Sequence, residues 1–464
     1  MDPIVIAGGG PSTVHLLSAL AGAKTITAPE VTIFDRRQPA EGGTPHSDPS
    51  PAFRVNMRSE LHDIPGRIGF ETFLKLHGGA EHDPPLRYDL GRYNRYVAEQ
   101  AIKELRGRGC SVQRVAENAV ALEPTGSGLW TMVGEGGARR VGRIVLATGM
   151  EAPTLPADVP RDQPTTYYTG DSQFAAAIRP SDRVVVLGTG PGAIDVARYL
   201  ICEAGHETPV VLTSRHALLS AVQTLQPVPS ELVAEIGAVV DGLERGRKPM
   251  TARQLGRFVG ELMAKADPGY DYRRLRKTSN DVGGALRQLR LDIAEAAAGG
   301  PAWRLVLEAI GAQAPRLWRW IGTEEQAKFL QLSAWYRFYY TKRHAMQMGT
   351  AVWQEAQMSS GRIVVQKGKP FPAHDRLVVA TGPEYRVNHS KSPLLKQMLA
   401  AGIGRAYCAP SSRFEIGGFE TRGLQLEGSP GIWVMGALAR GEDFAIHGYP
   451  ALARHAAWIV DAWQ

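Results

Sequence analysis

Two glycine-rich segments of identical spacing carry the strongest chemical signal in this sequence. They are Gly8–Thr13 (GGGPST) and Gly188–Ala193 (GTGPGA), and each stands between a short apolar run and a helical stretch. In such a turn the first glycine permits a tight bend, the second lets backbone approach a pyrophosphate, and the third position needs a small residue. Both segments depart from glycine at the third position. A single match could be a structural turn, but two matches in one chain predict two dinucleotide sites.

The residues that close the two βαβ units distinguish the expected ligands. Asp35 ends the apolar run 31–35, where a carboxylate accepts hydrogen bonds from ribose hydroxyls. Arg215 ends the run 210–215, where a guanidinium can pair with a 2′-phosphate. We therefore expect FAD in the first unit and NADPH in the second, with an ordinary solvated arginine as the alternative for Arg215.

The elements around these turns predict an α/β protein with two Rossmann-like dinucleotide-binding domains and a mostly helical insertion. Alternation and apolar runs predict the strands, and a period near 3.6 predicts the helices. The expected strands are 4–7, 31–35, 143–149, 184–187, 210–215, 363–365, 375–382 and 432–436, with an antiparallel meander over 111–141. The expected helices run from the first turn to about Leu20, over 88–105, from the second turn to about Cys202, and from about Pro450.

Residues 230–358 are predicted to be helical almost throughout, with breaks near Gly269, Gly299 and Gly311. One helix is expected to open on a capping box at Thr323–Gln326. Residues 241–346 hold 19 Lys and Arg against 11 Asp and Glu, a surplus of 8, so this segment carries the net charge of +7. Its dense piece, 273–277, could face an anion, but a solvated helix face is favoured because no nucleic-acid module surrounds it.

Composition excludes several classes of protein. With 464 residues, 44% hydrophobic and 21% charged, the chain is neither disordered nor fibrous. Its three cysteines, Cys110, Cys202 and Cys408, form no CxxC pair, which argues against a disulfide reductase, a zinc site and a secreted scaffold. We expect a cytoplasmic protein with no bound metal, no signal peptide, no membrane-spanning helix and no nucleic-acid partner.

The sequence resembles the two-dinucleotide-binding-domain flavoproteins. Ala-Thr-Gly occurs at 147–149 and at 380–382, where such chains cross between domains, and Asp375 precedes the second crossing as in flavin-dependent N-hydroxylases and Baeyer–Villiger-type monooxygenases. Further matches, at 214–216, 381–383, 392–395 and 436–442, make it similar to a bacterial FAD/NAD(P)-binding oxidoreductase family. The resemblance implies an FAD-binding domain of residues 1–165 and 360–464, an NADPH-binding domain of 166–229 and a helical cap of 230–359.

Together, the turns and the resemblance give the candidate cofactor-binding residues. They are Gly8, Gly10, Pro11, Ser12, Asp35, Asn56, Met57, Thr148, Gly149, Gly188, Gly190, Pro191, Gly192, Ser214, Arg215, His216, Thr381, Gly382 and Gly436. Asn56 and Met57 are included because related flavoproteins bring backbone to the flavin ring at this place, although plain core packing is an equal alternative.

Three residues are candidates for a role in catalysis. His447 precedes the terminal helix, whose N-terminus points at the flavin in such proteins, and it could exchange protons near neutral pH. Tyr340 and His344 share one helix face at i and i+4 and could line a pocket. For all three, ordinary packing is the alternative.

The absence of other catalytic motifs leaves the reactivity to the cofactors. The first hypothesis is an NADPH-dependent flavin monooxygenase, in which O2 adds at the flavin C4a and one oxygen atom passes to a small-molecule substrate. The alternatives are a flavin dehydrogenase or oxidase, and a non-catalytic redox-sensing flavoprotein. The substrate and the oligomeric state are left open.

Overall fold

The structure is a computed structural model of the 464-residue chain. It describes residues 2–23, 29–37, 42–79, 82–126, 128–157, 159, 161–224, 226, 228–246, 249–270, 283–332, 345–368, 373–444, 446 and 448–464.

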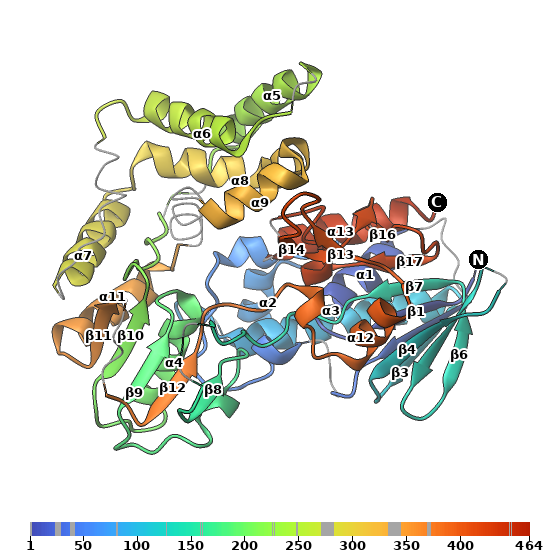
Figure 1. Ribbon diagram of the computed structural model, residues 1–464, viewed down its shortest axis with the longest axis horizontal. Coiled ribbons are helices and arrows are strands. Elements are labelled where there is room, and N and C mark those ends of the chain that lie inside the picture. The colour runs from blue at the N-terminus through green and yellow to red at the C-terminus, as the bar shows by residue number, and fades with distance from the viewer. Residues whose placement is uncertain are drawn as a thin grey trace.

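The first sheet has seven strands in the order β15-β16-β17-β7-β1-β2-β3. Its bounds are β1 Ile4–Ala7, β2 Glu30–Phe34, β3 Ser111–Val115, β7 Arg143–Leu146, β15 Thr421–Arg422, β16 Gln425–Leu426 and β17 Ile432–Val434. The five strands from β17 to β3 are parallel, and the order reverses between β1 and β7. Their apolar runs are buried because helices cover the sheet (Figure 1).

Three helices pack together beside this sheet. They are α1 Pro11–Gly22, α3 Arg87–Gly107 and α13 Tyr449–Asp461, and α1 contacts both of the others. The chain ends therefore lie in the same unit, on the right of Figure 1. The predicted meander needs one correction, because β3 pairs in parallel with β2 and only the later strands are antiparallel.

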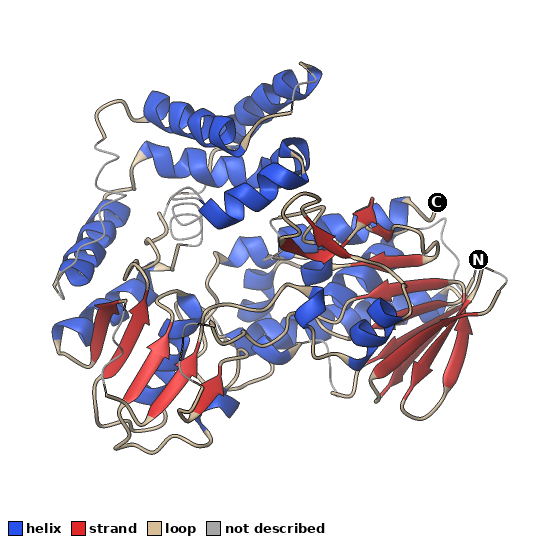
Figure 2. Ribbon diagram, viewed as in Figure 1, coloured by secondary structure: helices blue, strands red, loops and turns tan. Residues whose placement is uncertain are grey.

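The second sheet has five strands, all parallel, in the order β11-β10-β9-β12-β8 (Figure 2). Its elements are β8 Thr165–Tyr167, β9 Val184–Leu187, β10 Val210–Ser214, β11 Ile363–Lys367, β12 Arg376–Val379 and the helix α4 Pro191–Cys202. Strand pairing thus places β11 and β12 with the second glycine turn. This corrects the boundary expected at residue 360; the other domain boundaries stay predictions.

The helical segment does not form one unit. Helices α5 Ser230–Arg245, α6 Ala252–Ala266, α8 Ala302–Ile321 and α9 Thr323–Leu332 share a core that also includes Phe444. In contrast, α7 Gly284–Ala297 and α11 Met348–Ser359 pack into the core of the second sheet. Figure 1 shows the first group as a layer at the top left and the second group at the far left.

Two local predictions for these helices are wrong. Helix α8 runs through Gly311 and carries Pro315 in its interior, because buried apolar side chains hold it on both sides of these residues. Helix α9 begins at Thr323 as expected, but it lacks the capping box: the Gln326 amide donates to the Trp318 carbonyl at 2.8 Å, and its Oε1 accepts from no N–H group of the described residues. A complete capping box occurs elsewhere, at Thr251 and Gln254.

The remaining elements are short and lie at the edges. They are α2 Phe70–His77, α12 Pro393–Ala400, the antiparallel strands β4 Ala119–Pro124, β5 Trp130–Gly134 and β6 Ala138–Val141, the hairpin β13 Ala406–Cys408 and β14 Glu415–Phe419, and the 3-10 helices η1 Thr44–His46, η2 Ser59–His62, η3 Ser172–Ala175, η5 Val387–His389 and η6 Gly436–Ala439. None of the helices in the described part of the chain is long and apolar enough to cross a bilayer.

Candidate functional site: two dinucleotide turns under a helical layer

Each glycine turn lies where the strand order of its sheet reverses. Gly8 has φ +108°, and a Cβ there would lie 2.2 Å from the Ala147 carbonyl oxygen at the end of β7. Gly188 has φ +136°, and a Cβ there would lie 2.4 Å from the Ala380 carbonyl oxygen after β12. Both positions therefore require glycine. Parallel α/β sheets bind ligands at these reversal points, beyond the carboxyl ends of the strands.

The N-terminus of α1 has no side-chain cap. Its N-cap is Gly10, which provides no side-chain cap, and Pro11 fills the first helical position. The helix therefore offers backbone N–H groups and the positive end of its dipole, as an anion site requires. Thr13 replaces the usual third glycine, and its hydroxyl donates to the Gly8 carbonyl at 2.5 Å. This bond stabilises the turn and explains why threonine can replace glycine at the third position.

Asp35 lies beside the first turn. Its carboxylate accepts a hydrogen bond of 2.9 Å from the Gly9 amide, and Arg37 pairs with it at 3.0 Å. A carboxylate has further lone pairs, so these bonds do not prevent the predicted contact with ribose hydroxyls, which stays a prediction. Arg37 also reaches Thr44 in η1, and it thereby ties the segment after β2 to the loop beside Gly10.

The predicted Gly436 lies against the same turn. A Cβ on this residue, whose φ is +61°, would lie 3.1 Å from the Ser12 hydroxyl of α1. The Gly436 amide donates to Nδ1 of His455 in α13 at 3.2 Å, and Nε2 of His455 lies 3.2 Å from the carboxylate of Asp443. Gly436 and Ser12 are thus brought together, and α13 holds the backbone at that point.

The segment of Asn56 and Met57 is fixed by two glutamines that the sequence analysis did not identify. Nε2 of Gln223 donates to the carbonyls of Asn56 and Ala345, each at 2.7 Å. Nε2 of Gln347 donates to the Met57 carbonyl at 2.5 Å. The Met57 thioether lies 3.3 Å from the position of a Cβ on Gly448, the N-cap of α13. Met57 therefore lies at the start of the terminal helix, and its contact with the flavin stays a prediction.

The second turn is built on the same plan. The N-cap of α4 is Gly190, again with no side-chain cap, and a Cβ on Gly190 would meet nothing within 4 Å. Thr189 and Ser214 lie 3.1 Å apart through their hydroxyls, which joins the glycine turn to the end of β10. Arg215 follows directly and is exposed. The turn therefore has open space at Gly190, and Arg215 follows the residue that contacts the turn.

Other predicted residues are distributed around these turns. Pro191 opens α4, and a Cβ on Gly192 would lie 3.3 Å from the ring of Tyr168. His216 is half-buried after Arg215. Thr148 contacts the Gly8 position, and Gly149 follows with φ +81°. On the second sheet Thr381 is exposed, and Gly382 has φ +94°.

The three catalytic candidates, His447, Tyr340 and His344, lie outside the described residues, so their roles stay predictions. The basic piece at 273–277 also lies outside them. Within the described part of the chain, no group of three His, Cys, Asp or Glu side chains is arranged to hold a metal ion.

Comparison with known proteins identifies the fold. Residues 5–151 match the FAD-NAD(P)-binding family model. Solved structures with similar folds include an ornithine N-hydroxylase from Kutzneria sp. 744, with 16% identity, a TM-score of 0.54, and coverage of 100% of this chain and 98% of that one. The chain has the fold of the two-dinucleotide-binding flavoproteins.

Two further structures share this flavoprotein fold. The ornithine hydroxylase of Pseudomonas aeruginosa has 14% identity and a TM-score of 0.55, over 99% of this chain and 98% of that one. The flavin-containing monooxygenase of Stenotrophomonas maltophilia has 14% identity and a TM-score of 0.51, over 99% and 97%. No curated protein sequence matches. At these identities the similarity establishes the fold and leaves the substrate open.

In this flavoprotein fold the two sheets are joined by a buried charged cluster that the sequence analysis also missed. Arg87 of α3 pairs with the Asp195 carboxylate of α4 at 2.5 Å and donates to the Tyr168 hydroxyl at 3.0 Å. The Tyr168 hydroxyl in turn donates to Asp195 at 2.9 Å. Although burial opposes the charge, the Asp195 carboxylate raises the pKa of Arg87. The cluster spans both units, so it fixes one turn relative to the other.

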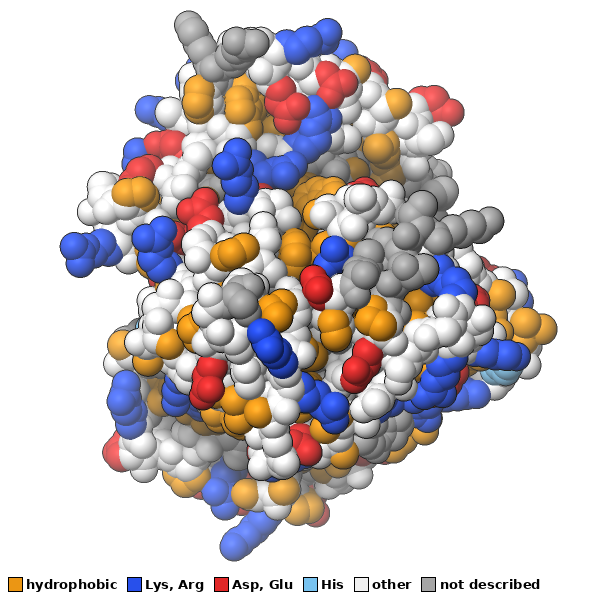
Figure 3. All heavy atoms as spheres, turned by 90° about the vertical axis from the view of Figure 1, so that its right-hand side faces the viewer, with side chains coloured by type: hydrophobic (Ala, Val, Ile, Leu, Met, Phe, Trp, Pro, Cys, Tyr) orange, Lys and Arg blue, Asp and Glu red, His pale blue; other side chains and the backbone are white. Residues whose placement is uncertain are grey.

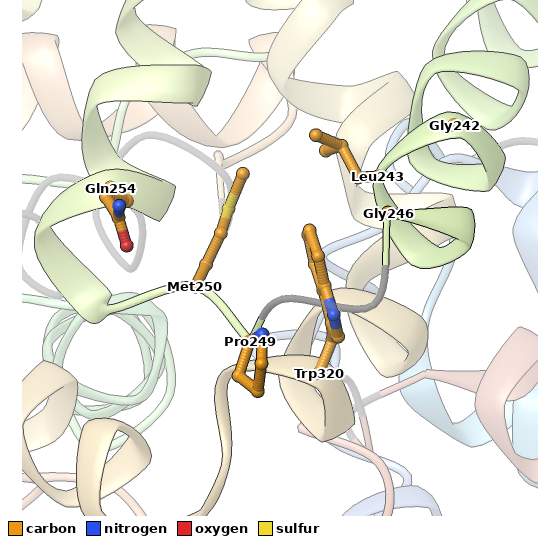
Figure 4. A pocket seen from close by; sticks show the side chains of 7 residues that line it. All are labelled: Gly242, Leu243, Gly246, Pro249, Met250, Gln254 and Trp320. Carbon is orange, nitrogen blue, oxygen red and sulfur yellow. The ribbon is translucent and has the colours of Figure 1, made fainter.

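The helical layer is anchored on the segment that follows β17. The Trp318 indole N–H donates to the Arg440 carbonyl at 3.2 Å, and the Trp318 ring stacks on Phe444 with centroids 4.5 Å apart. A separate hollow of about 290 Å³ opens between α5, α6 and α8, and its lining is mainly apolar (Figure 4). Its lining residues are Gly242, Leu243, Gly246, Pro249, Met250, Gln254 and Trp320. None of them belongs to either glycine turn.

Histidines surround Tyr449 at the start of α13, and they predict acid sensitivity. His15 and His62 lie with ring centroids 5.0 and 5.1 Å from that of Tyr449. Burial lowers the pKa of His15 from 6.5 to about 3, with a further contribution from His455, and burial lowers that of His62 to about 4. The unfolded chain therefore binds more protons below pH 6.5. Stability should be constant above that pH and fall below it, by up to about 1.4 kcal/mol per pH unit for each histidine.

Melting curves between pH 7.5 and 4.5, with flavin content followed in parallel, measure this effect. His62→Phe keeps an aromatic ring beside Phe70 and Tyr449, and it should reduce the acid slope by the contribution of one histidine. A melting temperature that does not change between pH 6.5 and 4.5 would contradict the assignment.

Proposed function

We propose that the protein is an FAD- and NADPH-dependent monooxygenase that acts on a small molecule. The observation that carries the proposal is the pair of helices α1 and α4, whose N-termini have no side-chain cap. Each N-terminus lies where the strand order of its own sheet reverses, and the same chain carries a helical layer. One such site serves a single dinucleotide, so two sites suit a tightly held cofactor and a nicotinamide donor. The ornithine hydroxylases and the flavin-containing monooxygenase with this fold add support.

The residues present fit FAD at the first turn. Glycines at positions 8 and 10 leave backbone free to approach a pyrophosphate, and a Cβ on Gly8 would collide with β7. In the proposal, the α1 N-terminus holds the phosphates, Asp35 accepts from the ribose, and the backbone at residues 55–57 lies toward the flavin. When bound, FAD would take up hydride from NADPH and react with O2. The chain itself supplies orientation and excludes water beneath the helical layer.

NADPH is assigned to the second turn, with Arg215 as the group that selects it over NADH. A charge-assisted contact between a guanidinium and a 2′-phosphate contributes about 1.5–3 kcal/mol. Arg215→Ala should therefore weaken NADPH binding at least about tenfold and leave NADH binding nearly unchanged. Titration of the flavin-loaded protein with each nucleotide measures the ratio. An equal loss for both nucleotides would show that Arg215 serves the fold instead.

Oxygen transfer is tested with labelled dioxygen. The purified protein is screened with amines, amino acids and ketones for substrate-stimulated oxidation of NADPH, and products are analysed by mass spectrometry under 18O2. A monooxygenase places one labelled atom in the product and the other in water. Oxidised product without label would instead identify a dehydrogenase or oxidase. NADPH turnover that no compound stimulates and that yields no product would favour the redox-sensing alternative.

A further inference from the structure

Arg304, near the start of α8, is a buried cation without a counter-ion among the described residues. Its side chain is 1% exposed, and none of its three guanidinium nitrogens has a hydrogen-bond partner in the part of the chain that the structure describes. Its Cζ lies 5.4 Å from the centroid of the Trp303 ring, which offers partial compensation of charge but no acceptor. Guanidinium stays charged at any ordinary pH, so this arrangement is costly unless an anion binds.

The position of Arg304 on α8 separates it from the apolar core of the helical layer. That core takes Trp303, Leu307 and Ile310 from one face of the helix. Arg304 and Glu308 are one helical turn apart and belong, with the buried Gly311 and Pro315, to a second face. A helix with two buried faces must be covered on the second one as well. Charged side chains on a buried helix face indicate that this face has a role besides packing.

The second face of α8 meets the loop that is predicted to lie beside the flavin. Arg58, the residue after Met57, extends to α8, where its Nη2 lies 3.5 Å from the Glu308 carboxylate. Nη1 of Arg58 also donates to the Gln226 carbonyl at 3.0 Å. Glu308 is 13% exposed and Arg58 is 19% exposed, so this ion pair is largely shielded from water. Nε of Arg58 also pairs with the Glu60 carboxylate at 2.8 Å, so Arg58 meets two carboxylates. Among the described residues, neither Glu60 nor Glu308 bonds to the Arg304 guanidinium.

We propose that Arg304 binds an oxyanion group of the substrate, so that the enzyme accepts small molecules bearing a carboxylate or phosphate. The inference rests on the proposed function only in assigning the anion to the substrate. The anion site itself rests on the burial of Arg304 and on its guanidinium nitrogens, which have no partner among the described residues. A guanidinium holds such a group with two parallel N–H···O bonds, which fixes orientation as well as charge. The other end of the molecule would then extend along α8 toward the Arg58 loop and the flavin.

Anion binding is measured first, without turnover. The flavin-loaded protein is melted with increasing succinate, inorganic phosphate or the neutral succinamide, at constant ionic strength set with sodium chloride. We expect succinate or phosphate, and not succinamide, to raise the melting temperature. Arg304→Met should lower the affinity for that anion at least about tenfold. It should also melt no lower than the wild type when no anion is added, because it removes a buried charge that has no hydrogen-bond partner among the described residues.

Arg316→Met, on the same helix, is the matched control. Arg316 pairs at the surface with Asp241 and Glu244 at 2.5 Å, so its loss should leave the anion response unchanged. The inference is overturned if neither anion stabilises the wild type, if Arg304→Met responds like the wild type, or if Arg304→Met melts well below it without anion. An equal response in both proteins would place the anion at a nucleotide turn.

The two proposals fail separately. If anions bind at Arg304 but no product carries label from 18O2, the proposed function is wrong and the anion site stands. If label is incorporated equally well into acids and their amides, and Arg304→Met leaves KM unchanged for both, the function stands and the substrate class is wrong.

Discussion

Gly188→Ala should unfold the second sheet at temperatures where the wild type is intact. Its φ of +136° is a region that L-residues rarely adopt, and the new Cβ would lie 2.4 Å from the carbonyl oxygen and 3.0 Å from the carbonyl carbon of Ala380. Both are backbone atoms beside β12, which is a central strand and cannot move aside without breaking its pairs. Backbone strain and the steric conflict together should cost at least about 3 kcal/mol.

The matched control is Gly190→Ala, two residues along the same turn. Gly190 has φ −88°, and its Cβ would meet nothing within 4 Å. This variant should melt like the wild type and yet bind NADPH more weakly, because the methyl group occupies space assigned to the pyrophosphate. Calorimetry and nucleotide titration of both variants separate a structural glycine from a ligand-facing one. Equal melting temperatures for the two variants would refute the distinction.

Arg87→Met should be the second variant with a large effect. It leaves the Asp195 carboxylate buried beside Tyr168 without its hydrogen-bonded cation, with Arg198 as a nearby charge, and breaking a buried pair in this way costs about 3–5 kcal/mol. Arg87 belongs to α3, whereas its partners belong to the second unit. The variant should therefore weaken the contact between the two units. Thermal denaturation should then separate into two transitions, with the flavin released in only one of them.

A double-mutant cycle tests the origin of that loss. Asp195→Leu added to Arg87→Met removes the unpaired charge and should restore part of the stability, so the two effects should be far from additive. Additive losses would mean that the two side chains act independently, and the ion pair would then not be the link between the units.

The sequence predicted the two sheets because their signals are local. A strand, a glycine turn and a helix are contiguous, and Asp35 and Arg215 follow their strands directly. Partners distant in the chain could not be predicted in this way. Gln223 and Gln347 carry no motif, and their function depends on meeting the carbonyls of residues 56 and 57 after folding.

The errors have physical causes of the same kind. The alternating pattern of β3 suits either an edge strand of a parallel sheet or an antiparallel meander, and only its pairing with β2 decides. Gly311 and Pro315 are weak helix formers, but the tertiary packing of α8 outweighs their local preference. Strands β11 and β12 follow a long helical segment, so nothing local indicates which sheet they join.

The strand order of the second sheet has a consequence for how the chain folds. Strand β12 lies between β9 and β8, yet roughly 160 residues separate it from the end of β10. At ordinary rates of synthesis this interval lasts about 10–30 s, during which β8 and β9 have emerged without the strand that pairs with both. Pairing across such a long loop is slow, and unpaired strand edges attract other chains. The nascent protein is therefore expected to depend on chaperones until residue 379 has been made, and truncation within the helical segment should yield aggregates instead of a smaller nucleotide-binding protein.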